Sequence, residues 1–168
     1  MSIDIDYYST PYGELILGSY DEKLCLCDWH DRKARATIDH RLAKTFNTAF
    51  KRKKSAITKR CKTQLDEYFS LKRKQFDIPI ALAGTDFQKL VWNGLLNIPF
   101  GDTYSYLQLA NKLNVHSAVR AVANANGANA ISIIIPCHRI IGSNGNLTGY
   151  AGGLQTKGKL LSLESNQS

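Results

Sequence analysis

Hydrophobic and polar positions alternate near the start of the chain, as they do in β-strands. The run IDIDYYST at residues 3–10 alternates, and Pro11 and Gly13 interrupt it. Two further β-rich runs, ELILGSY and KLCLCDW, are separated by the turn-forming residues Asp21 and Glu22. This pattern predicts an antiparallel hairpin or meander.

The pattern then becomes helical from about residue 39 to residue 71. Apolar residues recur every fourth position, at Leu42, Phe46 and Phe50 and again at Leu65 and Phe69. The run QFDIPIAL at residues 75–82 predicts a returning strand. Strands, helices and a returning strand together predict a small α/β domain over residues 1–84.

The second half contains two helix-start signals. Thr85 with Gln88 forms one capping box, and Ser105 with Gln108 forms another. The first helix is expected to place Phe87, Leu90, Val91, Leu95 and Ile98 on one face and to end at Pro99 and Gly101. A third helix, capped by Ser117, is expected to run to about Asn126. Two short helices joined by a tight turn are a candidate helix-turn-helix, although many structural helix pairs look the same.

The third helix has two different faces. Ala118, Val119, Val122 and Ala125 gather on a packing face, whereas Arg120, Ala123, Asn124 and Gly127 share the other. Small residues around one arginine would let a nucleic acid approach closely. A surface helix with an ordinary arginine is the alternative.

Composition and charge point to a globular protein with a polyanionic partner. The chain has 168 residues, of which 43 % are hydrophobic, and a net charge of +8. Such a charge favours nucleic acid. Residues 1–84 hold 16 basic and 11 acidic residues, and residues 85–168 hold six and three. The densest basic run, at residues 51–62, is either a solvated face or a nucleic-acid contact.

The sequence contains no apolar run long enough to span a bilayer, and its start is acidic and polar, unlike a signal peptide. We therefore expect a soluble intracellular protein with no membrane partner. The four cysteines, Cys25, Cys27, Cys61 and Cys137, do not resemble a disulfide framework. Cys25 and Cys27 with His30 could form a zinc site, but core cysteines are favoured and no metal site is expected.

A possible reactive thiol follows the apolar run ISIII at residues 131–135. This run predicts a short buried strand, and Pro136 keeps its predecessor extended. Cys137 comes next, beside His138 and Arg139, a setting in which a thiol can lose its proton. A buried structural cysteine is the alternative. Because adjacent side chains on an extended segment point opposite ways, coupling of Cys137 to His138 needs a turn or a bridging water.

The string IPCHRIIGSNGNLTGYAGG, followed by Lys157, Leu160, Leu161 and Glu164, resembles O6-alkylguanine-DNA alkyltransferases, the methylated-DNA–protein-cysteine methyltransferases. The resemblance extends to FQKLVWNGLLNIPFGDTYSYLQLA, RAVANANGAN and TPYGEL. It is dense over residues 86–164 and loose over residues 1–84. It implies a small ribonuclease-H-like α/β N-terminal domain, residues 1–84. A mostly helical, winged-helix-like domain would follow at residues 85–168, with a helix-turn-helix that enters the minor groove.

The resemblance also implies catalytic roles. Cys137 resembles the nucleophile and alkyl acceptor, and His138 the residue that takes its proton through a water. Glu164 resembles the residue that orients and charges this imidazole, which fits its position near a helix C-terminus, where a carboxylate needs compensation. Asn129 resembles the residue that braces the active-site turn. Tyr106, at a helix N-terminus, resembles the proton donor to the departing guanine.

Further residues resemble the DNA-binding and base-binding parts of the family. Arg120 resembles the finger that fills the gap left by the flipped nucleotide, and Ala121, Asn124 and Gly127 lie on the same helix. Tyr150, Ala151 and Gly152 resemble the loop that walls the base pocket. This chain departs from many relatives at Ala130, where they have proline after the asparagine.

The implied activity is single-turnover transfer of a methyl or small alkyl group from guanine O6, and thymine O4, to Cys137. The implied partner is double-stranded DNA carrying alkylated guanine. We expect no cofactor, a monomer, and a cytoplasmic protein, nucleoid-associated if bacterial. Two alternatives are an alkyltransferase-like protein that only binds the lesion, whose relatives replace the cysteine retained here, and a cysteine hydrolase.

Overall fold

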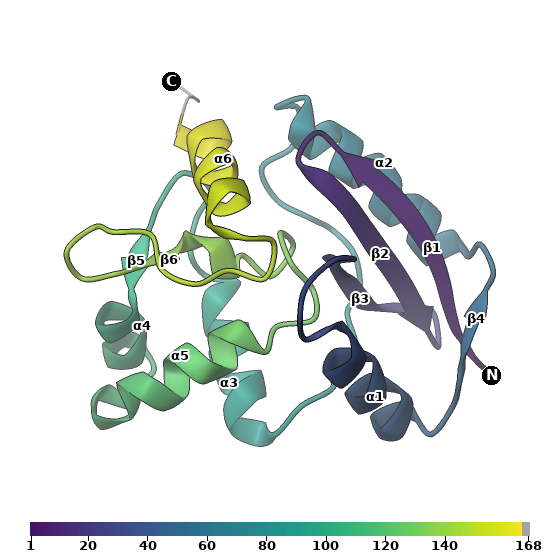
Figure 1. Cartoon of the computed structure of the whole chain (residues 1–168), viewed down its shortest axis with the longest axis horizontal. Helices are drawn as coiled ribbons and strands as arrows, with labels where there is room; N and C mark the ends of the chain where they lie inside the picture. The colour runs from purple at the N-terminus through teal and green to yellow at the C-terminus, as the bar shows by residue number, and fades with distance from the viewer. Residues whose placement is uncertain (166–168) are drawn as a thin grey trace. The chain divides into compact units, whose positions relative to one another are not determined.

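The computed structural model describes residues 1–165. The chain divides into two compact units, Met1–Gly84 and a second that begins at Thr85. Figure 1 shows a small sheet and helices in the first unit and a mostly helical second unit. Within the described residues, no helix combines the length and apolar character needed to cross a membrane.

The sheet of the first unit begins as an antiparallel meander of β1 (Ile3–Thr10), β2 (Gly13–Tyr20) and β3 (Lys23–Trp29). The predicted meander is confirmed. Asp21 and Glu22 make the turn between β2 and β3 in the left-handed region, with φ of 52° and 62°. A short β4 (Phe50–Arg52) pairs in parallel with β1, giving the strand order β3-β2-β1-β4.

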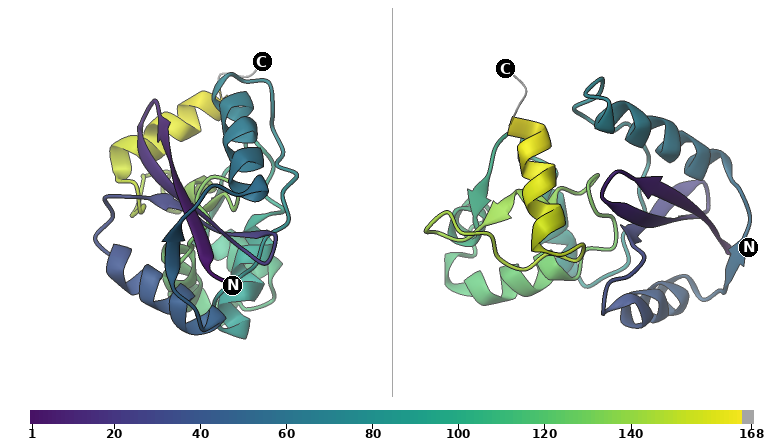
Figure 2. Two further views of the ribbon diagram at one scale, coloured as in Figure 1. Left: turned by 90° about the vertical axis from the view of Figure 1, so that its right-hand side faces the viewer. Right: turned by 45° about the horizontal axis from the view of Figure 1, so that its top comes forward.

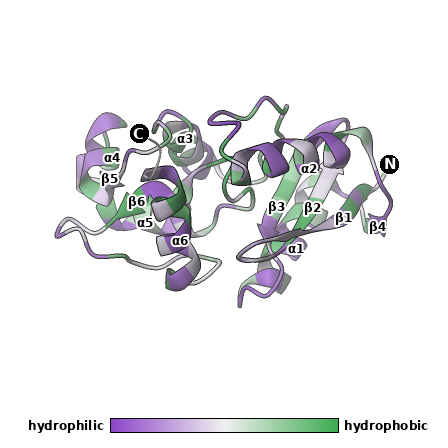
Figure 3. Cartoon of the chain, turned by 90° about the horizontal axis from the view of Figure 1, so that it is seen from above, coloured by the Kyte–Doolittle hydropathy of each residue, from purple (hydrophilic) through white to green (hydrophobic). Residues whose placement is uncertain are grey.

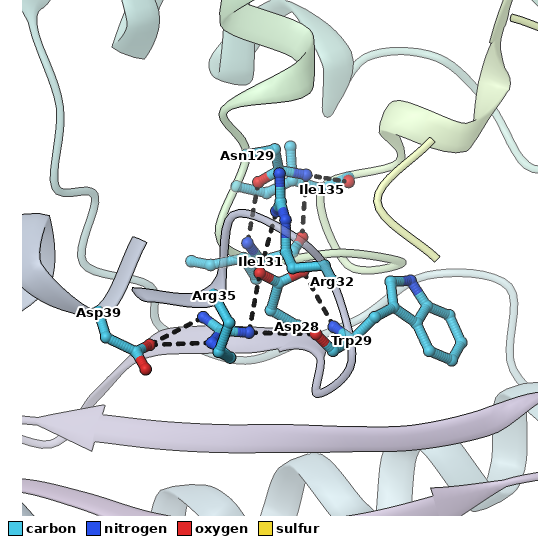
Figure 4. A network of polar contacts seen from close by, with 8 residues as sticks. All are labelled: Asp28, Trp29, Arg32, Arg35, Asp39, Asn129, Ile131 and Ile135. Atoms are coloured by element: carbon cyan, nitrogen blue, oxygen red, sulfur yellow. Dashed lines mark hydrogen bonds and ion pairs between the residues drawn. The ribbon is translucent and has the colours of Figure 1, made fainter. Parts of the chain in front are cut away.

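Two helices cover this sheet. Helix α2 (Ala56–Phe69) packs against the meander strands, and α1 (Arg35–Phe46) lies on the opposite side (Figure 2). A capping box of Ser55 and Thr58 starts α2. At the start of α1, buried Asp28 binds Arg32 at 3.0 Å and Arg35 at 3.1 Å, as the lower part of Figure 4 shows. The strands β2 and β3 carry mostly hydrophobic residues (Figure 3).

Two sequence predictions for the first unit are wrong. Phe50 was placed in a helical pattern, but α1 ends at Asn47, whose φ is 50°, and Phe50 begins β4. The expected strand at residues 75–82 is reduced to a single bridge between Leu24 and Ile80. Pro79 has no N–H to donate, so only its carbonyl and the Ala81 N–H bond to Leu24.

Three cysteines of the first unit lie in its core. Cys25, Cys27 and Cys61 are buried, and Cys27 hydrogen bonds with Cys61 of α2. Burial raises the pKa of Cys25 to about 12. His30 is exposed and lies near Glu14 and Asp31. Within residues 1–165, no three His, Cys, Asp or Glu side chains are grouped so as to hold a metal ion.

Up to residue 165, the second unit contains four α-helices, α3 (Asp86–Leu95), α4 (Tyr106–Lys112), α5 (Val119–Gly127) and α6 (Leu154–Ser165). The short strands β5 (Tyr104–Ser105) and β6 (Ile140–Ile141) pair in parallel. Both predicted capping boxes, at Thr85 and at Ser105, are confirmed. The indole of Trp92 on α3 donates to the Ala125 carbonyl on α5 at 2.8 Å, which ties these helices together.

Some details of these helices differ from the predictions. Leu90 is 42 % exposed, whereas Trp92 is buried, so the buried face of α3 is rotated from the expected one. Helix α3 also ends at Leu95, before Pro99 and Gly101. Ser117 does not cap α5, because it lies inside a 3-10 turn, His116–Ala118, and the N-cap is Ala118 without a side-chain bond.

Candidate active site

The segment before Cys137 is a buried turn, which corrects the predicted strand at residues 131–135. The N–H of Ile135 donates to the Ile131 carbonyl at 3.0 Å, and Ile133 has a φ of 71°. All five residues are buried. An apolar run that is buried on every side has no period that distinguishes a strand from a turn, which explains the error.

The side chain of Asn129 spans this turn (Figure 4). Its Nδ2 donates to the carbonyls of Ile135 at 2.9 Å and Ile131 at 3.3 Å, and its Oδ1 accepts from the Ile131 N–H at 2.9 Å. One amide therefore satisfies three backbone groups in an interior where unpaired polar groups are costly. Ala130 follows it and is buried.

Cys137 and His138 lie in a short 3-10 turn, Cys137–Arg139, directly after Pro136. Cys137 therefore does not end a strand, contrary to the prediction. Its side chain is 5 % exposed, and its N–H donates to the Ile135 carbonyl at 2.8 Å. Coupling of Cys137 to His138 was expected to need a turn or a bridging water, and the segment is a turn.

His138 is fully buried and hydrogen bonds with Glu164 of α6. The distance from Nε2 to Oε2 is 2.7 Å, and the hydrogen-bond network assigns the Nε2 proton to this bond. The expected pairing of Glu164 with His138 is present. Within residues 1–165, Nδ1 of His138 is buried without a hydrogen-bond partner. The ring therefore keeps one nitrogen able to accept a proton.

Sequence reasoning placed Arg139 beside the thiol but missed its bonds to Glu164. Its Nε donates to Oε1 of Glu164 at 2.8 Å, its Nη2 donates to Oε2 at 3.0 Å, and its Nη1 donates to the Ile98 carbonyl at 2.7 Å. Arg139 is only 6 % exposed. Glu164 was the feature that could have predicted this role of Arg139, because a buried carboxylate has more acceptor sites than one imidazole fills.

The buried charges set the protonation states of the site. Burial alone would raise the pKa of Glu164, but the hydrogen bonds and charges of His138 and Arg139 lower it to about 2. Burial lowers the pKa of His138, against the opposing effect of Glu164. At neutral pH the site therefore holds a carboxylate, a guanidinium and a neutral imidazole.

Tyr106, the first residue of α4, hydrogen bonds through its hydroxyl with Oγ1 of Thr148 at 2.9 Å. The backbone carbonyl of Thr148 in turn accepts from Nζ of Lys157 at 2.8 Å. Lys157 is fully buried in α6, and burial lowers its pKa, which a negative charge at Cys137 would raise. Thr148 and Lys157 thus hold the segment that Tyr106 contacts, and neither was predicted as a site residue.

The segment after Thr148 borders His138. The ring of Tyr150 lies edge-on to His138, with ring centroids 6.4 Å apart. Tyr150, Ala151 and Gly152 are partly exposed, and Gly153 has a φ of 91°, which starts α6 after a turn that favours glycine. The three residues predicted to wall the base pocket therefore lie in one partly exposed segment, and Tyr150 lies beside His138.

The exposed face of α5 carries the predicted DNA-binding residues. Arg120, Ala121, Asn124 and Gly127 are exposed, whereas Val122, Ala125 and Asn126 are buried. A Cβ built on Gly127 would meet no atom within 4 Å. Helices α4 and α5 pack together in helix-turn-helix order. This face carries small and polar side chains, and Arg120 is its one charged residue.

These groups can activate a thiol. A neutral imidazole beside Cys137 can accept its proton, and the carboxylate behind the ring stabilises the imidazolium that forms. The charge of Arg139 keeps the pKa of Glu164 low, so the proton stays on His138 and does not pass to Glu164. The arrangement suits nucleophilic attack by sulfur.

Two family models match this chain. The model described as 6-O-methylguanine DNA methyltransferase, ribonuclease-like domain, matches residues 5–82. The model described as 6-O-methylguanine DNA methyltransferase, DNA binding domain, matches residues 86–166. The expected fold class, a ribonuclease-like α/β unit followed by a mostly helical DNA-binding unit, is confirmed.

Curated relatives carry related names. The Bacillus subtilis inducible methylated-DNA–protein-cysteine methyltransferase is 51 % identical over 105 residues, which are 62 % of this chain and 59 % of the relative. The matched stretch therefore spans less than two thirds of that protein. The Methanosarcina barkeri methylated-DNA–protein-cysteine methyltransferase is 42 % identical over 161 residues, which are 96 % of each chain.

A solved structure is similar over nearly the whole chain. The crystal structure of Mycobacterium tuberculosis OGT in complex with DNA has a TM-score of 0.82 and 35 % identity, covering 97 % of this chain and 93 % of that one. Full-length similarity to the Methanosarcina protein, both family models and this structure agree. The chain belongs to the methylated-DNA–protein-cysteine methyltransferase family.

Proposed function

We propose that this protein repairs DNA by moving a methyl or small alkyl group from O6 of guanine, or O4 of thymine, to the sulfur of Cys137. One observation carries the proposal: His138, next to Cys137 in a buried turn, is held by Glu164 at 2.7 Å. The names of the relatives support methylated DNA as the substrate. The tuberculosis OGT structure in complex with DNA supports DNA as the partner.

The first step is activation of the thiol. The proton of Cys137 moves to Nδ1 of His138 through a bridging water, because Nε2 is already committed to Glu164. Glu164 stabilises the resulting imidazolium, which offsets the effect of burial on the His138 pKa. The product is a thiolate, the nucleophilic form of cysteine.

The second step is displacement at the alkyl carbon. The thiolate sulfur forms a bond to this carbon, the carbon–oxygen bond breaks, and its electron pair goes to the base. Tyr106 donates its phenolic proton to the departing base, and its bond to Thr148 keeps the hydroxyl oriented. Apart from the bridging water, every catalytic group in this scheme is a side chain of this protein, so the scheme needs no cofactor.

The product is a thioether, and this limits the protein to one reaction. Water hydrolyses an acyl-enzyme by attacking its carbonyl, but a thioether offers no such electrophile. Each molecule therefore transfers one alkyl group. We further propose that the protein acts as a monomer on double-stranded DNA in the cytoplasm.

The target atom lies inside a duplex, so the base must be flipped out, at a cost of a few kcal/mol. We assign this step to α5 in the minor groove, where the exposed small residues Ala121 and Gly127 permit close approach. Arg120 fills the space that the base leaves. Tyr150, Ala151 and Gly152 wall the pocket that receives it.

Counting turnovers on alkylated duplex DNA tests the proposal. One methyl group per protein molecule, found by intact mass and mapped to Cys137, is the expected result. No transfer with retained binding would instead identify an alkyltransferase-like binding protein. Many turnovers would identify a hydrolase, and a methyl group on Cys25, Cys27 or Cys61 would contradict the assignment of Cys137.

A further inference from the structure

The basic run at residues 51–62 spans adjoining elements of the first unit. It comprises Lys51, Arg52, Lys53, Lys54, Lys59, Arg60 and Lys62, from β4, the following loop and the first half of α2. Buried Asp6 connects its two ends: Oδ1 lies 3.5 Å from Arg52 and Oδ2 lies 2.6 Å from Lys62. We call these seven residues the cationic surface.

Most of this charge is not neutralised by the protein. Asp6 pairs with Arg52 and Lys62, and Asp77 pairs with Arg60 at 3.0 Å. Lys51, Lys53, Lys54 and Lys59 are exposed, and within residues 1–165 they form no ion pair. These four exposed lysines fall within residues 51–59, so this segment is suited to a partner with closely spaced negative charges.

The second unit offers much less positive charge at its surface. Two of its six basic residues, Arg139 and Lys157, are buried in the candidate active site. The other four share the surface with Asp86 and Asp102. The face of α5 itself carries only Arg120. A protein whose affinity for DNA comes from phosphate contacts therefore has its largest unused source of such contacts on the first unit.

The negative side chains near the cationic surface limit where an anion can bind. A cavity of about 640 Å³ adjoins Lys53 and Ser55, and its wall includes Asp4, Asp21 and Glu22. These carboxylates disfavour a small anion in the cavity. The exposed lysines that do not line it, Lys51, Lys54 and Lys59, instead favour an extended polyanion that follows the surface.

We propose that the cationic surface binds the phosphate backbone of DNA, as a second contact separate from α5. The proposal rests on the proposed function in one respect, namely that DNA is the substrate. The contact is independent of sequence and of the lesion, because lysines bind phosphates as point charges. It supplies affinity and holds the protein on DNA, whereas α5 and the pocket recognise the damaged base.

The test replaces the four unpaired lysines with glutamine in the full-length protein, as Lys51→Gln, Lys53→Gln, Lys54→Gln and Lys59→Gln. A matched control makes the same change in net charge at exposed lysines elsewhere on the first unit, as Lys23→Gln, Lys33→Gln, Lys44→Gln and Lys72→Gln. Binding to an undamaged duplex is measured between 50 and 200 mM salt. Each lysine that contacts a phosphate contributes about 0.9 to the slope of log K against log salt.

We expect the cationic-surface variant to lower this slope by about 3 to 4, and the control variant by less than 1. A version with four arginines in place of the four lysines should retain the full slope. Equal reductions in the glutamine variant and its control, or no change in either, would overturn the proposal. Methyl transfer to Cys137 at low salt is measured in parallel. Methyl transfer by the cationic-surface variant would leave the proposed function intact. Absence of methyl transfer by the wild type would refute the proposed function, independently of the DNA contact.

Discussion

Arg139 binds both carboxylate oxygens of Glu164, through Nε to Oε1 at 2.8 Å and through Nη2 to Oε2 at 3.0 Å. The same carboxylate accepts from His138 at 2.7 Å. Glu164 is therefore fixed from two sides before it acts on the imidazole. A planar guanidinium suits this geometry in a way that a lysine ammonium does not.

This relationship predicts acid-sensitive stability. The pKa of Glu164 is about 2 in the folded protein and ordinarily 4.5, so its contribution is complete above pH 4.5 and is lost as the pH falls toward 2. The loss amounts to about 3 kcal/mol. Chemical denaturation of the wild type and of Glu164→Gln at pH 6 and pH 3 measures the part of this loss that falls between these two pH values, about 2 kcal/mol. If both lose the same stability, Glu164 is not responsible.

The same substitution should alter the chemistry. Glu164→Gln removes the charge that stabilises protonated His138, so this imidazole becomes a weaker base for the Cys137 thiol. The profile of single-turnover rate against pH should shift to higher pH. Rates are compared at a temperature where circular dichroism shows both proteins folded. An unchanged profile would make Glu164 a purely structural residue.

Cys137→Ser should separate binding from transfer. A serine hydroxyl stays protonated where a thiol ionises, so the variant should bind alkylated DNA with wild-type affinity and transfer nothing. Gel-shift titration measures the binding, and intact mass measures the transfer. Wild-type transfer by the serine variant would refute the mechanism.

Thr148→Val should act through Tyr106. The substitution removes the hydroxyl that bonds with Tyr106 but keeps the carbonyl that accepts from Lys157. We expect a several-fold slower transfer, corresponding to about 1 kcal/mol. In a Tyr106→Phe background the same change should add little, because the hydroxyl being oriented is already gone. Additive losses would show that Thr148 acts by another route.

Arg120→Ala should slow repair of duplex DNA without affecting the fold, because Arg120 is exposed on α5. Free O6-alkylguanine requires no flipping, so its reaction with Cys137 should change far less. Arg120→Lys should rescue only partly, since an ammonium lacks the planar surface of guanidinium. Single-turnover rates on both substrates test this, and equal losses on the two would falsify the finger role.

The sequence predicted the elements whose signals are local. The meander follows from alternation and from the Asp21–Glu22 turn, and the helices α3 and α4 follow from their capping boxes. It failed at Phe50, because a three-residue strand is defined by pairing with β1 and has no pattern of its own. It also failed at residues 131–135, because an apolar run that is buried throughout has no period, and its turn is set by side-chain bonds of the nearby Asn129.

The site shows the same limit. Cys137, His138 and Glu164 could be singled out from residue types and from the family resemblance. Arg139 was visible in the same string, but its role depends on the Ile98 carbonyl, 41 residues earlier, and on Glu164, 25 residues later. Thr148 and Lys157 are likewise joined only by folding.

The order of these residues along the chain has a consequence for protein synthesis. Cys137 and His138 leave the ribosome well before Glu164, which occupies the last turn of α6. Until that turn forms, His138 lacks its carboxylate and Arg139 lacks its counter-charge. On the proposed mechanism, the nascent chain therefore carries a Cys137 thiol without its activating carboxylate, and the site is completed only when the last turn of α6 has folded.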